Sequence, residues 1–264
     1  MFRPIFSIAG TTIGEAIRRK VLLVILLIGA FLLILAPSLG ILSARSETTV
    51  LKGMMLGVIQ LTSAVIAIVL TVYMIPNEIE RRTIYTILSK PVQRWQFLVG
   101  KYLGAVGALG LMMALMGLLM VLMFRFEMGM TSVSDLSDLL KAPLMYFVQM
   151  SILASVAVAF STFVTPLVNF FLSGSIYLIG SLFNPFFETI QSSPNTPAVA
   201  KGFATLVNAI LPNFANYNVQ NPIINPGQEI HNEGSYYMMA TVYGVFYILI
   251  ALIVGILVFD RREV

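Results

Sequence analysis

The stretch PNEIERRTIYTILSKPVQRWQFLVGK, residues 76–101, is a dense polar segment between two long apolar runs. It holds five of the chain's 16 Lys and Arg residues and two of its 12 acidic residues. If the apolar runs cross a bilayer, this segment has to lie outside it, because charged groups are costly in hydrocarbon. We therefore predict an ordered polar loop at a membrane surface, joined stiffly to two membrane spans.

The composition of the whole chain supports a membrane protein. Of its 264 residues, 58% are hydrophobic and only 11% are charged, whereas soluble domains carry about 25% charged residues. We predict an all-α polytopic membrane protein in which residues 1–264 form a single membrane domain. The net charge of +4 follows from basic residues at membrane boundaries and does not indicate nucleic acid. The absence of cysteine excludes disulfides and thiolate metal sites.

A spanning helix needs about 20 mostly apolar residues, and the sequence offers six such stretches. A tight turn at Thr165-Pro166 separates the fourth from the fifth. The predicted spans are 21–42, 54–75, 102–124, 144–165, 167–187 and 236–259.

An even number of spans puts both termini on one side of the membrane. Eleven Lys and Arg residues then fall on that side and five on the other, which predicts cytoplasmic termini. Residues 76–101 are then cytoplasmic and residues 188–235 form a long outer loop. Within that loop, apolar residues at helical spacing predict a short amphipathic helix over 198–211, against the outer membrane face.

Residues 1–20 precede the first span. Apolar residues recur there at helical spacing with Thr12, Glu15 and Arg19 opposite, which predicts an amphipathic helix in the interface over 4–19. A cytoplasmic extension of the first span is the alternative.

Two prolines divide the polar loop. We expect Pro76 to close the second span, Asn77 to cap a short helix, and Pro91 to end it. The next helix runs through Arg94 into the third span. An ordinary loop whose basic residues only set the topology is the alternative, but two acids and a proline break favour a docking surface.

The loop also carries a motif: Glu78-Ile79-Glu80, Thr83, Leu88-Ser89, Pro91-Val92, Arg94, Phe97 and Gly100-Lys101. It resembles the signature of type-two ATP-binding-cassette (ABC) transporter permeases. The stretch Leu211-Pro212-Asn213-Phe214 with Tyr217-Asn218 is similar to a subgroup that includes the nitrous-oxide-reductase maturation permease. Arg82 departs from the pattern, since many members carry Gly there.

The resemblance implies the permease subunit of an ATP-driven transporter in a bacterial inner membrane. The loop would be a coupling helix docked on a cytoplasmic ATPase subunit, which binds the ATP and Mg²⁺, beside a second permease copy or a paralogue. The residues it implies for coupling are Glu78, Glu80, Arg81, Thr83, Pro91, Arg94 and Lys101. The alternative function is a relay that passes ATP-driven motion to an outer partner without bulk transport.

The chain offers no catalytic or cofactor motif of its own. A P-loop requires Gly, four residues, then Gly-Lys-Ser/Thr, but Gly100-Lys101 is followed by Tyr102 and preceded by Trp95 at the required position. We therefore expect a non-catalytic subunit. The absence of charged residues from the six span cores, where only Gln60, Gln149 and Asn169 are strongly polar, argues against an ion-coupled carrier.

Two further patterns have a structural and a functional interpretation. The lone His231 and a methionine face (Met112, Met116, Met120, Met123) could bind metal, but solvated loop and packing roles are favoured. Gly100, Gly104, Gly107 and Gly110 lie along one span and predict close helix packing, within the bundle or a dimer.

Overall fold

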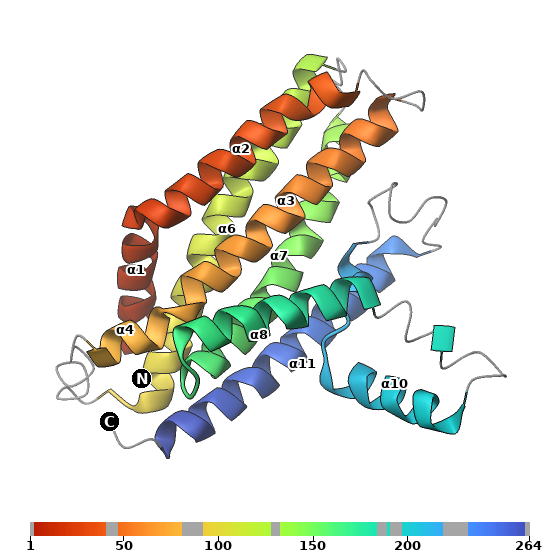
Figure 1. Cartoon of the computed structure of the whole chain (residues 1–264). Helices are drawn as coiled ribbons and strands as arrows, with labels where there is room; N and C mark the ends of the chain where they lie inside the picture. Colours follow the sequence, from red (N-terminus) through yellow and green to blue (C-terminus); the bar gives the residue numbers. More distant parts are fainter. Residues whose placement is uncertain are drawn as a thin grey trace.

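The structure, a computed structural model, is all-helical in the part of the chain that it describes. This part comprises residues 3–40, 47–80, 92–127, 133–183, 189–190, 197–218 and 232–261. Figure 1 shows the long helices packed side by side in one bundle. No strand occurs among these residues, as predicted for an all-α protein.

Five helices of the described residues are long and apolar enough to cross a membrane. They coincide with the first four predicted spans and the last. Their bounds are Lys20–Gly40 (α2), Glu47–Val72 (α3), Arg94–Glu127 (α6), Val133–Ser161 (α7) and Glu233–Asp260 (α11).

The predicted span 167–187 corresponds to a shorter helix, α8 (Pro166–Leu178), which continues as a π-helix, η1 (Ile179–Phe183). The turn before it lies where predicted, because Pro166 occupies the first turn of α8, where its missing N–H has no partner to lose. The helical run is shorter than about 20 residues and residues 184–188 lie outside the described part, so the six-span count stays a prediction.

The bundle has a buried centre and two exposed flanks. The apolar segments of α3 and α7 are 72% and 67% buried, whereas those of α2 and α11 are 22% buried. Figure 1 shows α2 and α11 on opposite sides of the bundle. Leucines, isoleucines and phenylalanines on these flanks are exposed, as expected for side chains that meet lipid.

The three strongly polar residues of the predicted span cores, Gln60, Gln149 and Asn169, form hydrogen bonds inside the bundle. Gln60 of α3 donates to Gln149 of α7 at 3.3 Å, and the amide of Asn169 donates to the Ala157 carbonyl at 2.9 Å. Ser173 donates to the Asn169 side chain at 2.9 Å. These neutral bonds join α3, α7 and α8 where water would be absent.

The N-terminal residues form a separate helix, α1 (Arg3–Arg18), which is followed by a break at Arg19. Its buried face packs against α6, so Thr12, expected on the polar side, is buried instead. The Thr12 hydroxyl donates to the Ile8 carbonyl at 2.8 Å, which leaves its methyl group free to pack. The position of α1 at the membrane interface stays a prediction.

The segment between α8 and α11 contains an amphipathic helix, α10 (Ala198–Ile210), at the predicted place, and a short 3-10 turn, η2 (Ala215–Tyr217). Val199, Phe203, Leu206 and Ile210 make an exposed apolar stripe on α10. In Figure 1, α10 stands apart from the long helices. The η2 turn packs against α7, and its Tyr217 is 1% exposed.

Candidate functional site

The predicted coupling loop begins on a short helix, α4 (Met74–Glu80), which continues α3 after a break at Tyr73. Pro76 lies inside α4, so the expectation that Pro76 closes the span is wrong by one turn. The reason is geometric: Pro76 has no N–H for the Val72 carbonyl, so the regular ladder ends at Val72. Asn77 is not a cap, because its N–H bonds the Tyr73 carbonyl at 3.2 Å.

Lys101 of α6 is a buried cation, with 4% of the residue exposed. Its ammonium lies 2.5 Å from a carboxylate oxygen of Glu78 on α4 and 3.7 Å from one of Glu15 on α1. A buried ammonium is stable only when it is paired, and this pairing comes from two other helices. Lys101 therefore joins α1, α4 and α6; we call Glu15, Glu78 and Lys101 the ion clamp.

Arg94, at the first residue of α6, joins that helix to the end of α11. Its guanidinium donates to the carbonyl oxygens of Phe259 at 2.9 Å and Asp260 at 3.4 Å. It also lies 5.7 Å from the centre of the Phe259 ring. A cation at a helix C-terminus stabilises the last carbonyl groups and the helix dipole, so Arg94 caps α11.

Three glycines in the first half of α6 lie against α1. A Cβ atom on Gly104 would lie 2.5 Å from the Thr12 Cβ and 2.8 Å from the Ala9 carbonyl oxygen. One on Gly100 would lie 2.9 Å from the Ile8 Cβ, and one on Gly107 would lie 2.9 Å from the Ile13 Cδ1. Only glycine permits so close an approach. In this structure, then, α1 is the neighbour of Gly100, Gly104 and Gly107, whereas Gly110 lies against Phe147 of α7.

The remaining predicted residues are spread around this region. Glu80 is exposed at the end of α4, whereas Arg81, Thr83 and Pro91 lie outside the described residues. His231 also lies outside them. Met112, Met116 and Met120 are buried in the core, and the described residues contain no group of three His, Cys, Asp or Glu side chains that could hold a metal.

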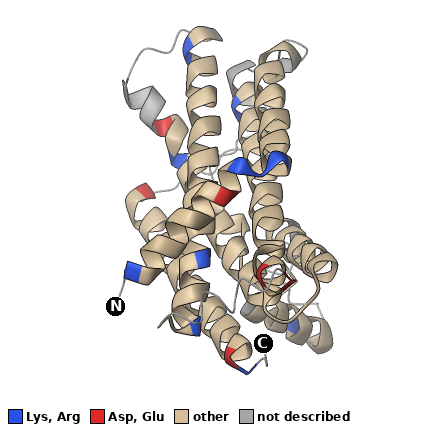
Figure 2. Ribbon diagram, turned by 90° about the vertical axis from the view of Figure 1, so that its left-hand side faces the viewer, with Lys and Arg blue, Asp and Glu red and all other residues tan. Residues whose placement is uncertain are grey.

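Both ends of the bundle carry charge, and the long helices between are mostly uncharged (Figure 2). The start of α1, α4, the start of α6 and the end of α11 meet at one end (Figure 1). At the opposite end, Lys141 of α7 pairs with Asp138 at 2.7 Å and with Glu233 of α11 at 2.8 Å. Each end is thus tied by ion pairs between helices.

A bundle of apolar helices with charged ends suits a multi-pass membrane protein, and the comparison with protein families agrees. Residues 6–264 match the family model described as ABC-2 family transporter protein. The chain belongs to the ABC-2 transporter family. No curated protein matches it. As an ABC-2 protein, the chain is a multi-pass membrane component of an ABC transporter, and ABC-2 permeases generally work with a cytoplasmic ABC ATPase.

A second polar region of this ABC-2 protein was not expected from its sequence. Residues 210–218, which we call the re-entrant segment, lie against the middle of α7 and α11 and not beyond their ends. Tyr247, about 21 Å along α11 from Glu233, bonds the Ile210 carbonyl at 2.5 Å. Further hydroxyl contacts join Tyr243 to the Asn213 N–H (3.2 Å), Tyr236 to the Asn216 carbonyl (2.8 Å) and Tyr217 to the Ala240 carbonyl (2.8 Å).

The other side of the re-entrant segment contacts α7 and η1. Gln149 donates to the Phe214 carbonyl at 3.3 Å, and the Phe214 N–H donates to the Gly180 carbonyl at 3.1 Å. Tyr146 donates to the Asn218 side chain at 2.5 Å. Irregular backbone is stable beside lipid only where protein bonds it. These contacts bond the segment, in which Phe214 and Tyr217 are buried while Ile210 and Asn216 are exposed.

Sequence reasoning missed two contributors to the site. Glu15 was assigned to the polar side of α1, and the α11 terminus was not connected with Arg94. A signal for Glu15 existed, since it is the sole acid among the first 46 residues of the chain. The sequence also held a signal for the re-entrant segment. The tyrosines of α11 at positions 236, 243 and 247 recur on one helix face, where their hydroxyls can bond the backbone of a neighbouring loop.

Proposed function

We propose that this ABC-2 protein is the permease subunit that couples ATP hydrolysis on a separate ATPase to movement of the bundle. The observation that carries the proposal is the ion clamp. Glu78 lies just before residues 81–91 and Lys101 lies just after them, and their 2.5 Å contact ties the two sides of the predicted coupling loop together.

The ion clamp and the Arg94 cap would transmit a displacement of the loop to several helices of the bundle. Lys101 connects the loop to α1 and α4, and Arg94 connects the start of α6 to the end of α11. α4 continues α3, and α6 is a single helix of 34 residues. A displacement of the loop by the ATPase would therefore move α1, α3, α6 and α11 together.

The topology belongs to the same proposal. Both termini are cytoplasmic by the distribution of Lys and Arg, and α8 with η1 forms part of a sixth span. The protein resides in a bacterial inner membrane and works as a homodimer or with a paralogue. The ATPase partner supplies the ATP and Mg²⁺ sites, and this chain is non-catalytic.

A relay to an outer partner is the second candidate, and one observation favours it. The re-entrant segment is joined through Gln149 to Gln60 of α3, which continues into α4 and the ion clamp. Motion of α3 would thereby reach the loop that follows α8. The segment also contains the stretch that is similar to the nitrous-oxide-reductase maturation subgroup.

The test is to purify the protein with its ATPase and measure transport-linked ATP hydrolysis. Glu80→Lys and Arg94→Glu should each uncouple hydrolysis while the protein still inserts normally. Lys201→Glu, a charge reversal on α10, is the matched control and should leave coupling intact. Purification of the permease alone under gentle conditions, or normal coupling in both variants, would contradict the proposal.

The two candidates are separated by a deletion within residues 198–218. Loss of an outer partner's activity with transport retained favours the relay, and loss of transport favours the permease that moves cargo. The deletion has to be compared at equal amounts of inserted protein, because it removes buried contacts such as those of Phe214.

A further inference from the structure

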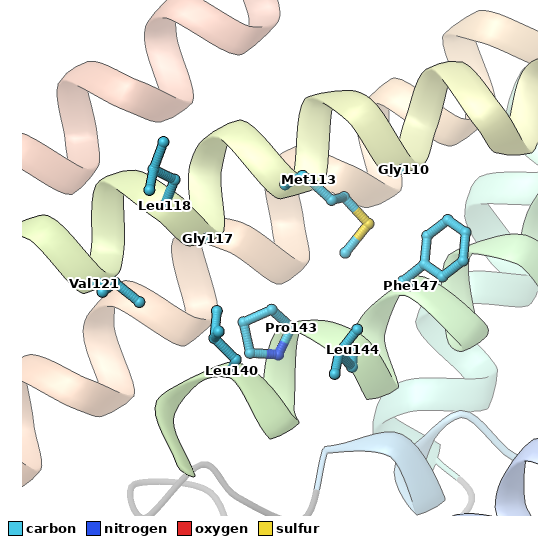
Figure 3. A pocket seen from close by; sticks show the side chains of 10 residues that line it. Gly110, Met113, Gly117, Leu118, Val121, Leu140, Pro143, Leu144 and Phe147 are labelled. Carbon is cyan, nitrogen blue, oxygen red and sulfur yellow. The ribbon is translucent and has the colours of Figure 1, made fainter. Parts of the chain in front are cut away.

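An apolar groove lies between α6 and α7, away from the ion clamp. Its volume is about 530 Å³, within the range of small-ligand sites. It is lined by small and apolar residues of the two helices, and Figure 3 shows Met113 and Pro143 between the two ribbons. Gly110 and Gly117 leave gaps between the side chains of the α6 wall.

The groove has the length of one membrane leaflet. From Gly110 to Val121 it follows α6 for roughly 16 Å, and half of a bilayer's hydrocarbon core is about 15 Å. It occupies the half of α6 nearer Glu127, which is the end remote from the ion clamp. Leu118 and Leu144 beside it are more than half exposed, so the groove is open to the surrounding lipid.

A cation stands at the remote end of the groove. Arg125 is exposed in the last turn of α6, one turn beyond Val121 and therefore on the same helix face. A long basic side chain at the end of a spanning helix reaches the headgroup level of the bilayer. An acyl chain in the groove would bring its headgroup to this arginine.

We propose that the groove is a binding site for one acyl chain of an anionic phospholipid, with Arg125 on its phosphate. The occupant is a bilayer lipid in the leaflet remote from the termini. The apolar lining selects a hydrocarbon chain, the leaflet-long shape holds it along the membrane normal, and the guanidinium selects negative charge. This lipid is a resident of the permease, bound whether or not transport occurs.

The measurement is native mass spectrometry of the full-length protein titrated with phosphatidylglycerol or phosphatidylcholine of identical acyl chains. The wild type should retain phosphatidylglycerol about fivefold more than phosphatidylcholine, which corresponds to one basic contact. Arg125→Gln should remove this preference. Arg261→Gln, an exposed arginine at the opposite end of the bundle, is the control and should retain it.

The groove itself is tested by filling it. A Cβ at Gly117 would lie 3.8 Å from Leu140 and 4.0 Å from Pro143, so Gly117→Leu should fit the fold and displace the chain. Gly174→Leu on α8, where a Cβ meets nothing within 4 Å, is the matched control. If Gly117→Leu fails to fold, Leu144→Trp fills the groove from α7.

Retention of both lipids to the same extent by the wild type would overturn the proposal, as would unchanged retention in the folded groove-filling variants. A second copy of the chain is the competing occupant. Because the protein has no cysteine, Leu144→Cys introduces a single thiol. Its efficient oxidation to a covalent dimer in membranes would show that a second copy covers the groove, which would also overturn the proposal.

Discussion

The ion clamp and the re-entrant segment hold loops to the same bundle by different chemistry. The clamp uses full charges, with the Lys101 ammonium 2.5 Å from the Glu78 carboxylate. The re-entrant segment uses neutral groups, with tyrosine hydroxyls and the Gln149 amide on backbone atoms. The first lies at the end of the bundle and the second lies against its middle.

The difference reflects the distance from water. Near the bundle end, Glu15 is more than half exposed, so the charges of the clamp keep part of their hydration. Tyr247 lies in the middle of α11, where a charged side chain would meet hydrocarbon. A carbonyl group without a hydrogen bond is also costly there, and the neutral tyrosine hydroxyl supplies that bond. We therefore expect the clamp to respond strongly to single substitutions and the re-entrant segment to respond weakly to each.

The largest effect is expected for Lys101→Met. The change leaves the half-buried Glu78 carboxylate without its cation, which destabilises a protein by about 4 kcal/mol for a buried pair. Coupled ATPase activity should be lost, and the melting temperature in detergent should fall. The double variant Lys101→Met with Glu78→Gln should recover much of the stability but not the coupling.

A double variant no more stable than Lys101→Met alone would show that Lys101 acts through packing and not through the pair. The matched control is Lys141→Met at the opposite end, whose ammonium is more exposed. It should lower the melting temperature much less than Lys101→Met, because exposed pairs contribute little to stability.

Gly104→Leu should have the next largest effect, about 3 kcal/mol, because overpacking at this helix contact forces α1 from α6. A Cβ there would lie 2.8 Å from the Ala9 carbonyl oxygen, a backbone atom that cannot rotate away. Limited proteolysis should cleave the α1 region faster. Gly57→Leu on α3, where a Cβ meets nothing within 4 Å, is the control; equal cleavage in both would contradict the close packing of α1.

Gln149→Leu tests the re-entrant segment at its most connected side chain. The change removes the bonds to Gln60 and to the Phe214 carbonyl and should destabilise the protein by about 2 kcal/mol. Hydrogen exchange of the Phe214 region should accelerate while that of α1 stays unchanged. Faster exchange in both regions would show that the two ends are not independent.

The smallest effect is expected for Tyr247→Phe, which removes one hydroxyl from the Ile210 carbonyl. Loss of a single neutral bond should lower stability by about 1 kcal/mol. Thermal unfolding of the purified protein measures the change. A loss as large as that of Lys101→Met would overturn the contrast drawn between the two regions.

The sequence predicted the features that depend on local pattern. Five spans follow from runs of apolar residues, the turn before α8 follows from Pro166, and the start of α6 follows from the residues after Pro91. The sequence also pointed to residues 76–101 by their charge. The regular helix α3 ends one turn before Pro76, at Val72. The reason is that proline lacks the N–H group that would bond the carbonyl four residues earlier.

The sequence could not predict which side chains pair with each other across the bundle. Lys101 and Glu78 are 23 positions apart and Arg94 and Phe259 are 165 apart, and no spacing rule relates them. The glycine face of α6 predicted a close neighbour, but not that α1 is this neighbour. The sequence predicts that 211–218 belongs to an outer loop, and it gives no sign of the contacts with α7 and α11, because the polar residues of this stretch suit water as well as a bonded interior.

By itself, the sequence determined that the protein lives in a bilayer, where its apolar runs lie and which family motif it carries. Those properties arise from local hydrophobicity and backbone constraints, which need no partner. Only the tertiary structure decided which helix meets each charge, that residues 210–218 return to the middle of the bundle, and where a groove opens. These depend on distant side chains brought together by packing, and the free energy of each pairing exists only once the helices have met.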